Sequence, residues 1–149
     1  MKRHTRLALI VAILVAIAIP GVAQHPSEDG TARTADTGPT FVAYYFFGNM
    51  RCATCRKLEA YSEEAITDAF GEDLASGTLA WRAVNVDEPD NTHFVHDFDL
   101  VTKSLVLVEY RDGGVVRFSN LTKIWQKVGD KDEFLEYVRD STREFIGES

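Results

Sequence analysis

The chain has 149 residues, of which 45% are hydrophobic and 11% aromatic, so it is long enough to fold as one globular domain with its own core. Its formal net charge is −7 at pH 7, and the first 23 residues hold three basic residues and no acidic one, which leaves 13 basic and 23 acidic residues in the remainder. So acidic a chain argues against nucleic acid as a partner.

The N-terminus predicts export. Residues 1–6 are cationic, residues 7–19 form an apolar run, and a Pro-Gly step and small residues follow, so we expect residues 1–23 to be a signal peptide cut after Ala23. The apolar run is shorter than the roughly 18 residues of a membrane-spanning helix. The alternative is that this segment is not cleaved and anchors the chain in the membrane, and we consider no other membrane association. We therefore predict a protein of the bacterial periplasm or the extracellular space.

The next elements are a linker, a strand and a helix. Residues 24–39 offer almost no side chain for burial, which is typical of a flexible linker, and the domain is expected over residues 40–149. The apolar, aromatic run of residues 41–47 predicts a central strand that is buried on both faces. Apolar residues then recur every three or four positions, which predicts a helix over residues 53–70 that Gly71 ends.

The second half of the domain predicts three more strands. Residues 79–87 form the second strand, which should run parallel to the first because a helix joins the two. Residues 91–98 predict a weaker helix. Residues 105–110 and 115–118 flank an Asp-Gly step at Asp112, which predicts an antiparallel hairpin.

A helix is expected to close the domain. After a short helical or irregular bridge over residues 121–128, Asp130 is expected as the N-cap, with Glu133 completing a capping box. The helix should stop near Gly147. Its inward-facing stripe is predicted to be Phe134, Leu135, Val138, Thr142 and Phe145.

The only two cysteines, Cys52 and Cys55, lie three residues apart between the first predicted strand and the helix after it. Unpaired N–H groups and the helix dipole stabilise a thiolate at the start of a helix, and a second cysteine one turn later can attack a mixed disulfide formed by the first. Arg51, Arg56 and Lys57 surround the pair, and we expect Arg51 and Arg56 to lower the pKa of Cys52. The pattern predicts a dithiol redox centre.

The order strand, helix, strand, helix, hairpin and helix, with Cys-x-x-Cys after the first strand, resembles the minimal form of the thioredoxin-like superfamily. Residues 47–59 (Phe-Gly-Asn-Met-Arg-Cys-Ala-Thr-Cys-Arg-Lys-Leu-Glu) resemble exported bacterial ArsF-type thioredoxin-like proteins. The resemblance implies an α/β domain with a central mixed four-stranded sheet flanked by helices. We expect no cofactor, because the sequence has no glycine-rich phosphate loop and no nicotinamide or flavin motif. It also implies that Cys52 is the nucleophile and Cys55 the resolving thiol, with Arg56 in the basic position that commonly follows the second cysteine.

The chain departs from the thioredoxin pattern in three places. Met50-Arg51 replaces the usual Trp before the motif and Ala53-Thr54 replaces Gly-Pro, so the redox potential does not carry over. Phe46 stands where a buried acid is expected. The loop expected to contact substrate lacks the usual cis-proline and consists of Thr102, Lys103 and Ser104. The prediction therefore rests on the dithiol chemistry and not on substrate docking at this loop.

We predict an exported thiol–disulfide oxidoreductase that exchanges the Cys52–Cys55 pair with a protein partner; a membrane electron donor is one candidate partner. The alternative is a non-catalytic thioredoxin-like interaction or metal-handling subunit that uses the same cysteines. His93 and His96 follow the second strand and would complete a zinc set with them. This spacing has low specificity, and we expect no bound metal.

Overall fold

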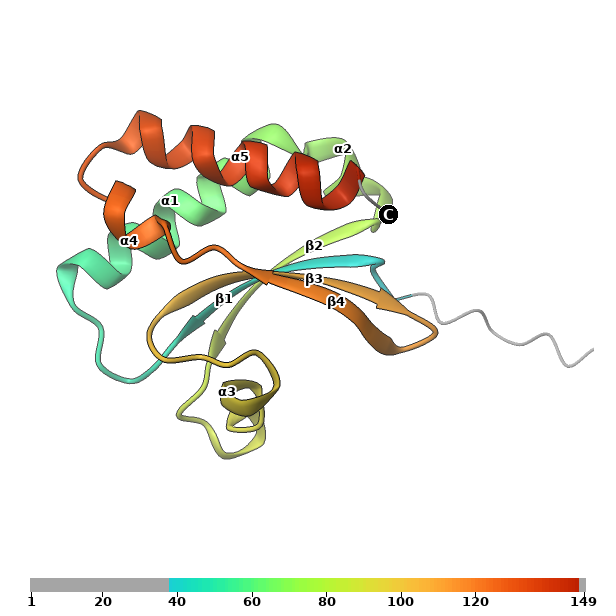
Figure 1. The fold of residues 1–149 in the computed structure, drawn as a ribbon, viewed down its shortest axis with the longest axis horizontal. Coiled ribbons are helices and arrows are strands. Elements are labelled where there is room, and N and C mark those ends of the chain that lie inside the picture. The colour runs from blue at the N-terminus through green and yellow to red at the C-terminus, as the bar shows by residue number, and fades with distance from the viewer. Residues whose placement is uncertain (1–37, 148–149) are drawn as a thin grey trace, which may run out of the picture. The chain divides into compact units, whose positions relative to one another are not determined.

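The computed structural model describes residues 38–147, which form a four-stranded sheet with helices on both faces (Figure 1). The strands β1 (Phe41–Phe47), β2 (Leu79–Asn85), β3 (Ser104–Arg111) and β4 (Gly114–Asn120) are arranged in the order β2-β1-β3-β4. β1 and β2 are parallel, whereas the other two pairs are antiparallel. This is the predicted mixed sheet, with the strand order and directions of a minimal thioredoxin-like fold.

β1 is central because both of its faces are apolar. Its first six residues are all buried, as predicted from the continuous apolar run. Successive side chains of a strand point to opposite faces of the sheet. The odd-numbered residues from Phe41 therefore enter a large core under the long helices, and the even-numbered residues from Val42 enter a smaller core on the other face.

Four helices lie on the face of the large core (Figure 1), namely α1 (Ala53–Ala69), α2 (Gly71–Ser76), α4 (Ile124–Lys127) and α5 (Lys131–Gly147). The buried residues of α5 are those of the predicted stripe, Phe134, Leu135, Val138, Thr142 and Phe145. Their three- and four-residue spacing puts them on one side of the helix, against the sheet and α1.

The predicted capping box at the start of α5 is half formed. The Asp130 carboxylate accepts the Glu133 N–H at 3.1 Å, so Asp130 caps the helix as predicted. The reciprocal bond is replaced, because the Asp130 N–H donates to the Lys127 carbonyl at 3.0 Å and the Glu133 carboxylate pairs with the Lys127 ammonium. The Glu133 carboxylate thus binds Lys127 of the preceding helix and not the Asp130 N–H, which it would accept in a complete capping box.

The prediction that Gly71 ends the first helix was wrong in part. α1 ends at Ala69, but the chain resumes helical geometry at Gly71 and forms α2. Two acidic residues in the first turn of α2 favour a helix start, and Leu74 packs against the large core. The stop comes at Gly77, whose φ of 77° is the left-handed conformation that favours glycine.

The other face of the sheet is covered only by short elements. The helix predicted over residues 91–98 is a 3₁₀ turn (Pro89–Asn91) followed by α3 (Phe94–Asp97). The ring of Phe94 packs on Phe46 of β1, with centroids 5.2 Å apart. α3 thus closes the smaller core near the C-terminal end of β1.

The β3–β4 hairpin has the turn that its sequence predicts. Asp112 and Gly113 both have positive φ, 53° and 75°, as a two-residue turn matched to the twist of the strands requires. The pairing of β3 with β4 shifts register between Glu109 and Tyr110, just before this turn.

The predicted signal peptide, residues 1–23, and most of the predicted linker lie outside the described residues. Residues 38–147 contain no helix that is both long and apolar enough to cross a membrane.

Candidate functional site

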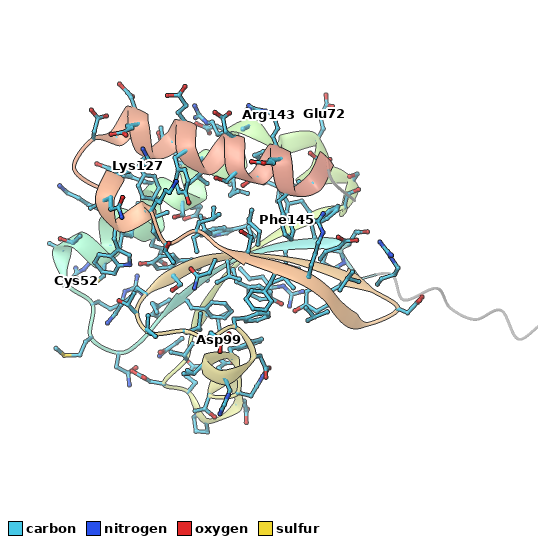
Figure 2. All side chains as sticks on the ribbon, in the orientation of Figure 1. Cys52, Glu72, Asp99, Lys127, Arg143 and Phe145 are labelled. Atoms are coloured by element: carbon cyan, nitrogen blue, oxygen red, sulfur yellow. A yellow bond between two sulfur atoms is a disulfide. The ribbon has the colours of Figure 1, made fainter. Side chains whose placement is uncertain are left out.

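A disulfide joins Cys52 and Cys55 at the start of α1, where Figure 2 labels Cys52. Cys52 is the N-cap residue, and its Sγ accepts the Cys55 N–H at 3.1 Å. Cys52 is exposed, whereas Cys55 is 3% exposed because it lies inside the helix and faces the sheet. An external thiol therefore reaches Cys52 first. The nucleophile and resolving roles themselves remain predictions.

The basic cluster around the disulfide is partly neutralised. The Arg51 guanidinium pairs with the Glu59 carboxylate of α1 and lies over the Phe47 ring, 4.0 Å from its centroid. The Arg56 guanidinium donates to the Arg51 carbonyl at 3.1 Å, and neither it nor Lys57 has an ion pair within residues 38–147. The sequence predicted that Arg51 lowers the pKa of Cys52, but it did not predict that Glu59 would pair with Arg51 and offset that charge.

A buried tyrosine of β1 forms a hydrogen bond to the backbone of the dithiol motif. The Tyr45 hydroxyl donates to the Cys55 carbonyl at 2.8 Å, and the side chain is fully buried. Burial raises the pKa of Tyr45 to about 12, against a smaller opposing effect of the Arg51 charge, so the hydroxyl stays a donor at neutral pH. Phe46, where an acid was expected, faces the smaller core instead.

The loop that leads to Cys52 is pinned to the end of β2. The Asp87 carboxylate accepts the Asn49 N–H at 2.7 Å, and the Asn85 amide donates to the Asn49 side-chain oxygen at 2.9 Å. Gly48 passes so close that a Cβ there would lie 2.7 Å from Asp87 Oδ2. The Asp87 carboxylate therefore fixes the path of the chain into α1, which the sequence interpretation did not anticipate.

The predicted substrate loop lies beside this entry. Thr102 and Lys103 line a groove of about 270 Å³ together with Met50, whose side chain is 81% exposed. Ser104 is turned inward, is 4% exposed, and donates to the Thr102 carbonyl at 3.0 Å. The Trp125 indole N–H holds the loop by donating to the Lys103 carbonyl at 2.9 Å. The loop contains no cis peptide, in keeping with its lack of proline.

The zinc set considered from the sequence is not assembled. Within residues 38–147, no group of three or more His, Cys, Asp or Glu side chains is arranged to hold a metal ion. His93 instead bonds Asp97 within its own helical turn, with Nδ1 2.8 Å from Oδ2. Both candidate sulfur ligands are tied up in the disulfide.

Four contacts around the dithiol were missed, and they differ in how visible they are in the sequence. Glu59 lies four residues after Cys55, so helix geometry alone places the two on one face. Tyr45 has the odd-numbered register that points toward the helices. Asp87 and Trp125 have no local signal, because their partners are 38 and 22 residues away in the chain.

No protein-family model and no curated protein matches the chain. Similar solved structures include the thioredoxin of Fasciola hepatica (18% identity, 62% of this chain and 82% of that chain covered, TM-score 0.37). A thioredoxin from Thermus thermophilus has 17% identity, coverage of 68% and 73%, and a TM-score of 0.41. The oxidised thioredoxin of Plasmodium falciparum has 18% identity, coverage of 61% and 80%, and a TM-score of 0.37. From the strand order and directions described above, residues 38–147 have the thioredoxin-like α/β fold.

Proposed function

We propose that the protein is an exported thiol–disulfide oxidoreductase that exchanges its Cys52–Cys55 disulfide with the thiols of a protein partner. The observation that carries this proposal is the asymmetry of the pair, with one exposed and one buried sulfur bonded at a helix N-terminus. A disulfide between residues three apart closes only a single helical turn, so as a purely structural crosslink it would add little to the stability of the fold. A reversible redox role makes better use of this position.

In the proposed exchange, a partner thiolate attacks Cys52 Sγ and the Cys52–Cys55 bond breaks, with Cys55 leaving as a thiolate that takes up a proton. A second partner thiolate then attacks the partner sulfur of the mixed disulfide and releases Cys52. The partner has lost two electrons and gained a disulfide, and the protein holds two thiols. The unpaired N–H groups and dipole of α1 stabilise the released Cys52 thiolate, and the same steps run in reverse for a partner disulfide.

The proposed partner surface is the groove beside the dithiol. Met50 and Val101 flank it with exposures of 81% and 94%, although both are apolar. Exposed apolar side chains beside a reactive group fit a protein partner better than a small hydrophilic thiol. A membrane electron donor, and the finer ArsF-type resemblance, stay predictions.

The redox test uses the full-length chain and two variants. We expect dithiothreitol to reduce the folded protein reversibly in a redox titration, Cys55→Ser to trap a mixed disulfide through Cys52, and Cys52→Ser to abolish exchange. Thr67→Ser, at an exposed position of α1 well away from the cysteines, is the matched control and should exchange normally. A disulfide that resists reduction in the folded protein, or faster alkylation of Cys55 than of Cys52, would contradict the proposal. About one zinc or copper per reduced chain, lost in Cys55→Ser, would favour the metal-handling alternative.

Export is a separate part of the proposal and rests on the composition of residues 1–23. An oxidising compartment would also preserve a disulfide of this kind. N-terminal sequencing of native protein should find a chain that begins near Gln24. An intact Met1 in the cytoplasmic fraction would remove the export claim, and an intact Met1 in the membrane fraction would support the uncleaved anchor.

A further inference from the structure

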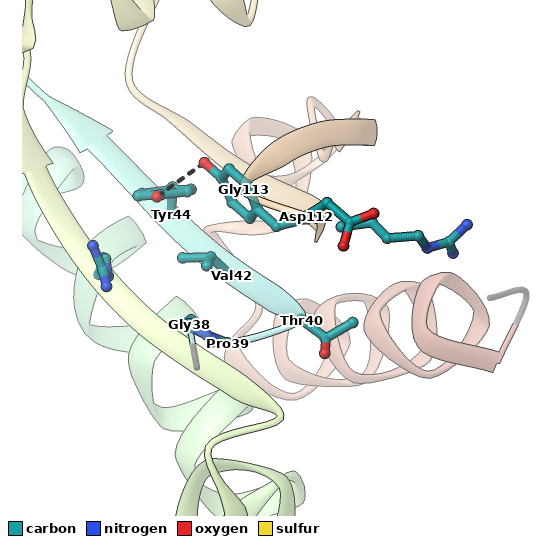
Figure 3. A pocket seen from close by; sticks show the side chains of 10 residues that line it. Gly38, Pro39, Thr40, Val42, Tyr44, Asp112 and Gly113 are labelled. Atoms are coloured by element: carbon teal, nitrogen blue, oxygen red, sulfur yellow. Dashed lines mark hydrogen bonds between the residues drawn. The ribbon is translucent and has the colours of Figure 1, made fainter. Parts of the chain in front are cut away.

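A second pocket lies at the other end of β1, on the sheet face that the long helices leave free. Its volume is about 480 Å³, within the range of small-molecule sites. Val42 and Tyr44 of β1 line it together with Asp112 of the hairpin turn (Figure 3), and Arg82 of β2 and Tyr110 of β3 also belong to its lining. α3 does not line this pocket.

Arg82 supplies a positive charge that no carboxylate of residues 38–147 pairs with, although it opposes the rise in the pKa of Tyr110. Its side chain is exposed and makes no hydrogen bond or ion pair within residues 38–147. Every other arginine in that range bonds a carboxylate or a backbone carbonyl. A free guanidinium presents a planar pair of donors that matches a carboxylate. The cation is notable on a chain whose net charge is −7.

The two tyrosines add a donor and an apolar wall. Their hydroxyl oxygens lie 3.2 Å apart, so one O–H is shared between Tyr44 and Tyr110 and the second is free to donate to a ligand. Burial, followed by the hydrogen bond to Tyr44, raises the pKa of Tyr110, so the Tyr110 hydroxyl keeps its proton at neutral pH. The Tyr110 ring is half-buried and offers an apolar surface next to this donor, whereas Val42 and Tyr44 are almost fully buried in the pocket wall.

The remaining charges limit what fits. Arg111 also lines the pocket, but its guanidinium donates to the buried Glu109 carboxylate at 2.7 Å. Asp112 puts a negative charge at the rim, which disfavours a second anionic group on a ligand. The pocket therefore has one available cation and selects against polyanions.

We propose that this pocket binds a small organic monoanion, whose carboxylate pairs with Arg82 and whose flat apolar body lies against the Tyr110 ring. The site is independent of the dithiol, which follows the opposite end of β1.

The test compares 2-naphthoate with its neutral analogue 2-naphthamide in an NMR titration of the full-length chain. We expect saturable shifts of the Val42, Tyr44, Arg82 and Gly113 amides with 2-naphthoate, and binding of 2-naphthamide weaker by about tenfold or more. Arg82→Gln should weaken 2-naphthoate by a similar factor and leave 2-naphthamide unchanged. Arg143→Gln, which removes the same charge from the exposed face of α5, is the matched control and should bind 2-naphthoate normally.

Arg82→Lys keeps the charge but loses the planar donor pair, and it should fall between the wild type and Arg82→Gln. It also serves if Arg82→Gln fails to fold. Equal affinity for 2-naphthoate and 2-naphthamide, no saturable shifts at the four amides, shifts confined to the groove beside Met50, or unchanged binding in both Arg82 variants would each overturn the proposal.

Discussion

The pairing of Arg51 with Glu59 changes what is expected of the thiol chemistry. Because the guanidinium contacts the carboxylate, both charges lie at a similar distance from Cys52 and largely cancel there. We therefore predict that Arg51→Gln raises the pKa of the Cys52 thiol, that Glu59→Gln lowers it, and that the double variant stays close to the wild type.

The magnitude follows from helix geometry. Glu59 follows Cys52 by seven residues, which at about 1.5 Å per residue places its charge roughly 10 Å from the sulfur. A unit charge at about 10 Å contributes about 0.4 kcal/mol at the dielectric constant of water and about 1.7 kcal/mol at an effective value of about 20. Each single variant should therefore move the pKa of Cys52 by about 0.3 to about 1.2 in opposite directions.

The assay is the rate of iodoacetamide alkylation against pH, measured in a Cys55→Ser background so that only Cys52 reacts. Arg56→Gln is the reference, because Arg56 has no carboxylate partner within residues 38–147 and its removal should raise the pKa of Cys52 without compensation. The reasoning fails if the double variant shifts the pKa as far as Arg51→Gln alone, or if Glu59→Gln raises it.

Three further predictions concern the supports of the site. Gly48→Ala should push the Asp87 carboxylate off its backbone partner and cost about 1 kcal/mol in urea unfolding, and it should be nearly neutral in an Asp87→Ala background. Because burial raises the pKa of Tyr45 from 10.0 to about 12, the folded state should lose stability as the pH rises from 10.0 to about 12, and unfolding titrations should show a smaller loss in Tyr45→Phe. Trp125→Phe should slow exchange with a protein disulfide by loosening the loop before β3, whereas Trp81→Phe should leave the rate unchanged, because Trp81 makes no hydrogen bond to that loop.

The elements that the sequence predicted well are those with a strong local signal. The continuous apolar run of β1, the stripe of α5 and the Asp-Gly turn each have one structure that satisfies their side chains, and the structure shows it. α2 was missed because a glycine is a weak stop: Gly71 permits a break at Phe70 but does not forbid a new helical turn after it.

In the candidate site, too, the features with a local sequence signal were predicted, and those that depend on contacts between distant residues were not. The disulfide and the exposure of its two sulfurs follow from local spacing at a helix start, so the sequence sufficed for them. The charge balance did not follow, because Arg51 is near the cysteines in sequence but bonds a side chain two helical turns further on. The supports at Asp87 and Trp125 depend on strand register and on packing between distant segments, which no local pattern encodes.

Strand β1 contributes a residue to each of the two candidate sites, on opposite faces of the sheet. Tyr45 and Tyr44 are neighbours in β1, yet Tyr45 points toward α1 and bonds Cys55, whereas Tyr44 points to the opposite face and bonds Tyr110. Both rings are buried, so each is held by packing on its own face rather than by the other. A ligand on the Tyr44 face therefore has no direct contact with the dithiol, and only a movement of β1 itself would couple them. Because β1 is paired on both edges by β2 and β3, such a movement would break ladder hydrogen bonds, and we expect the two sites to act independently.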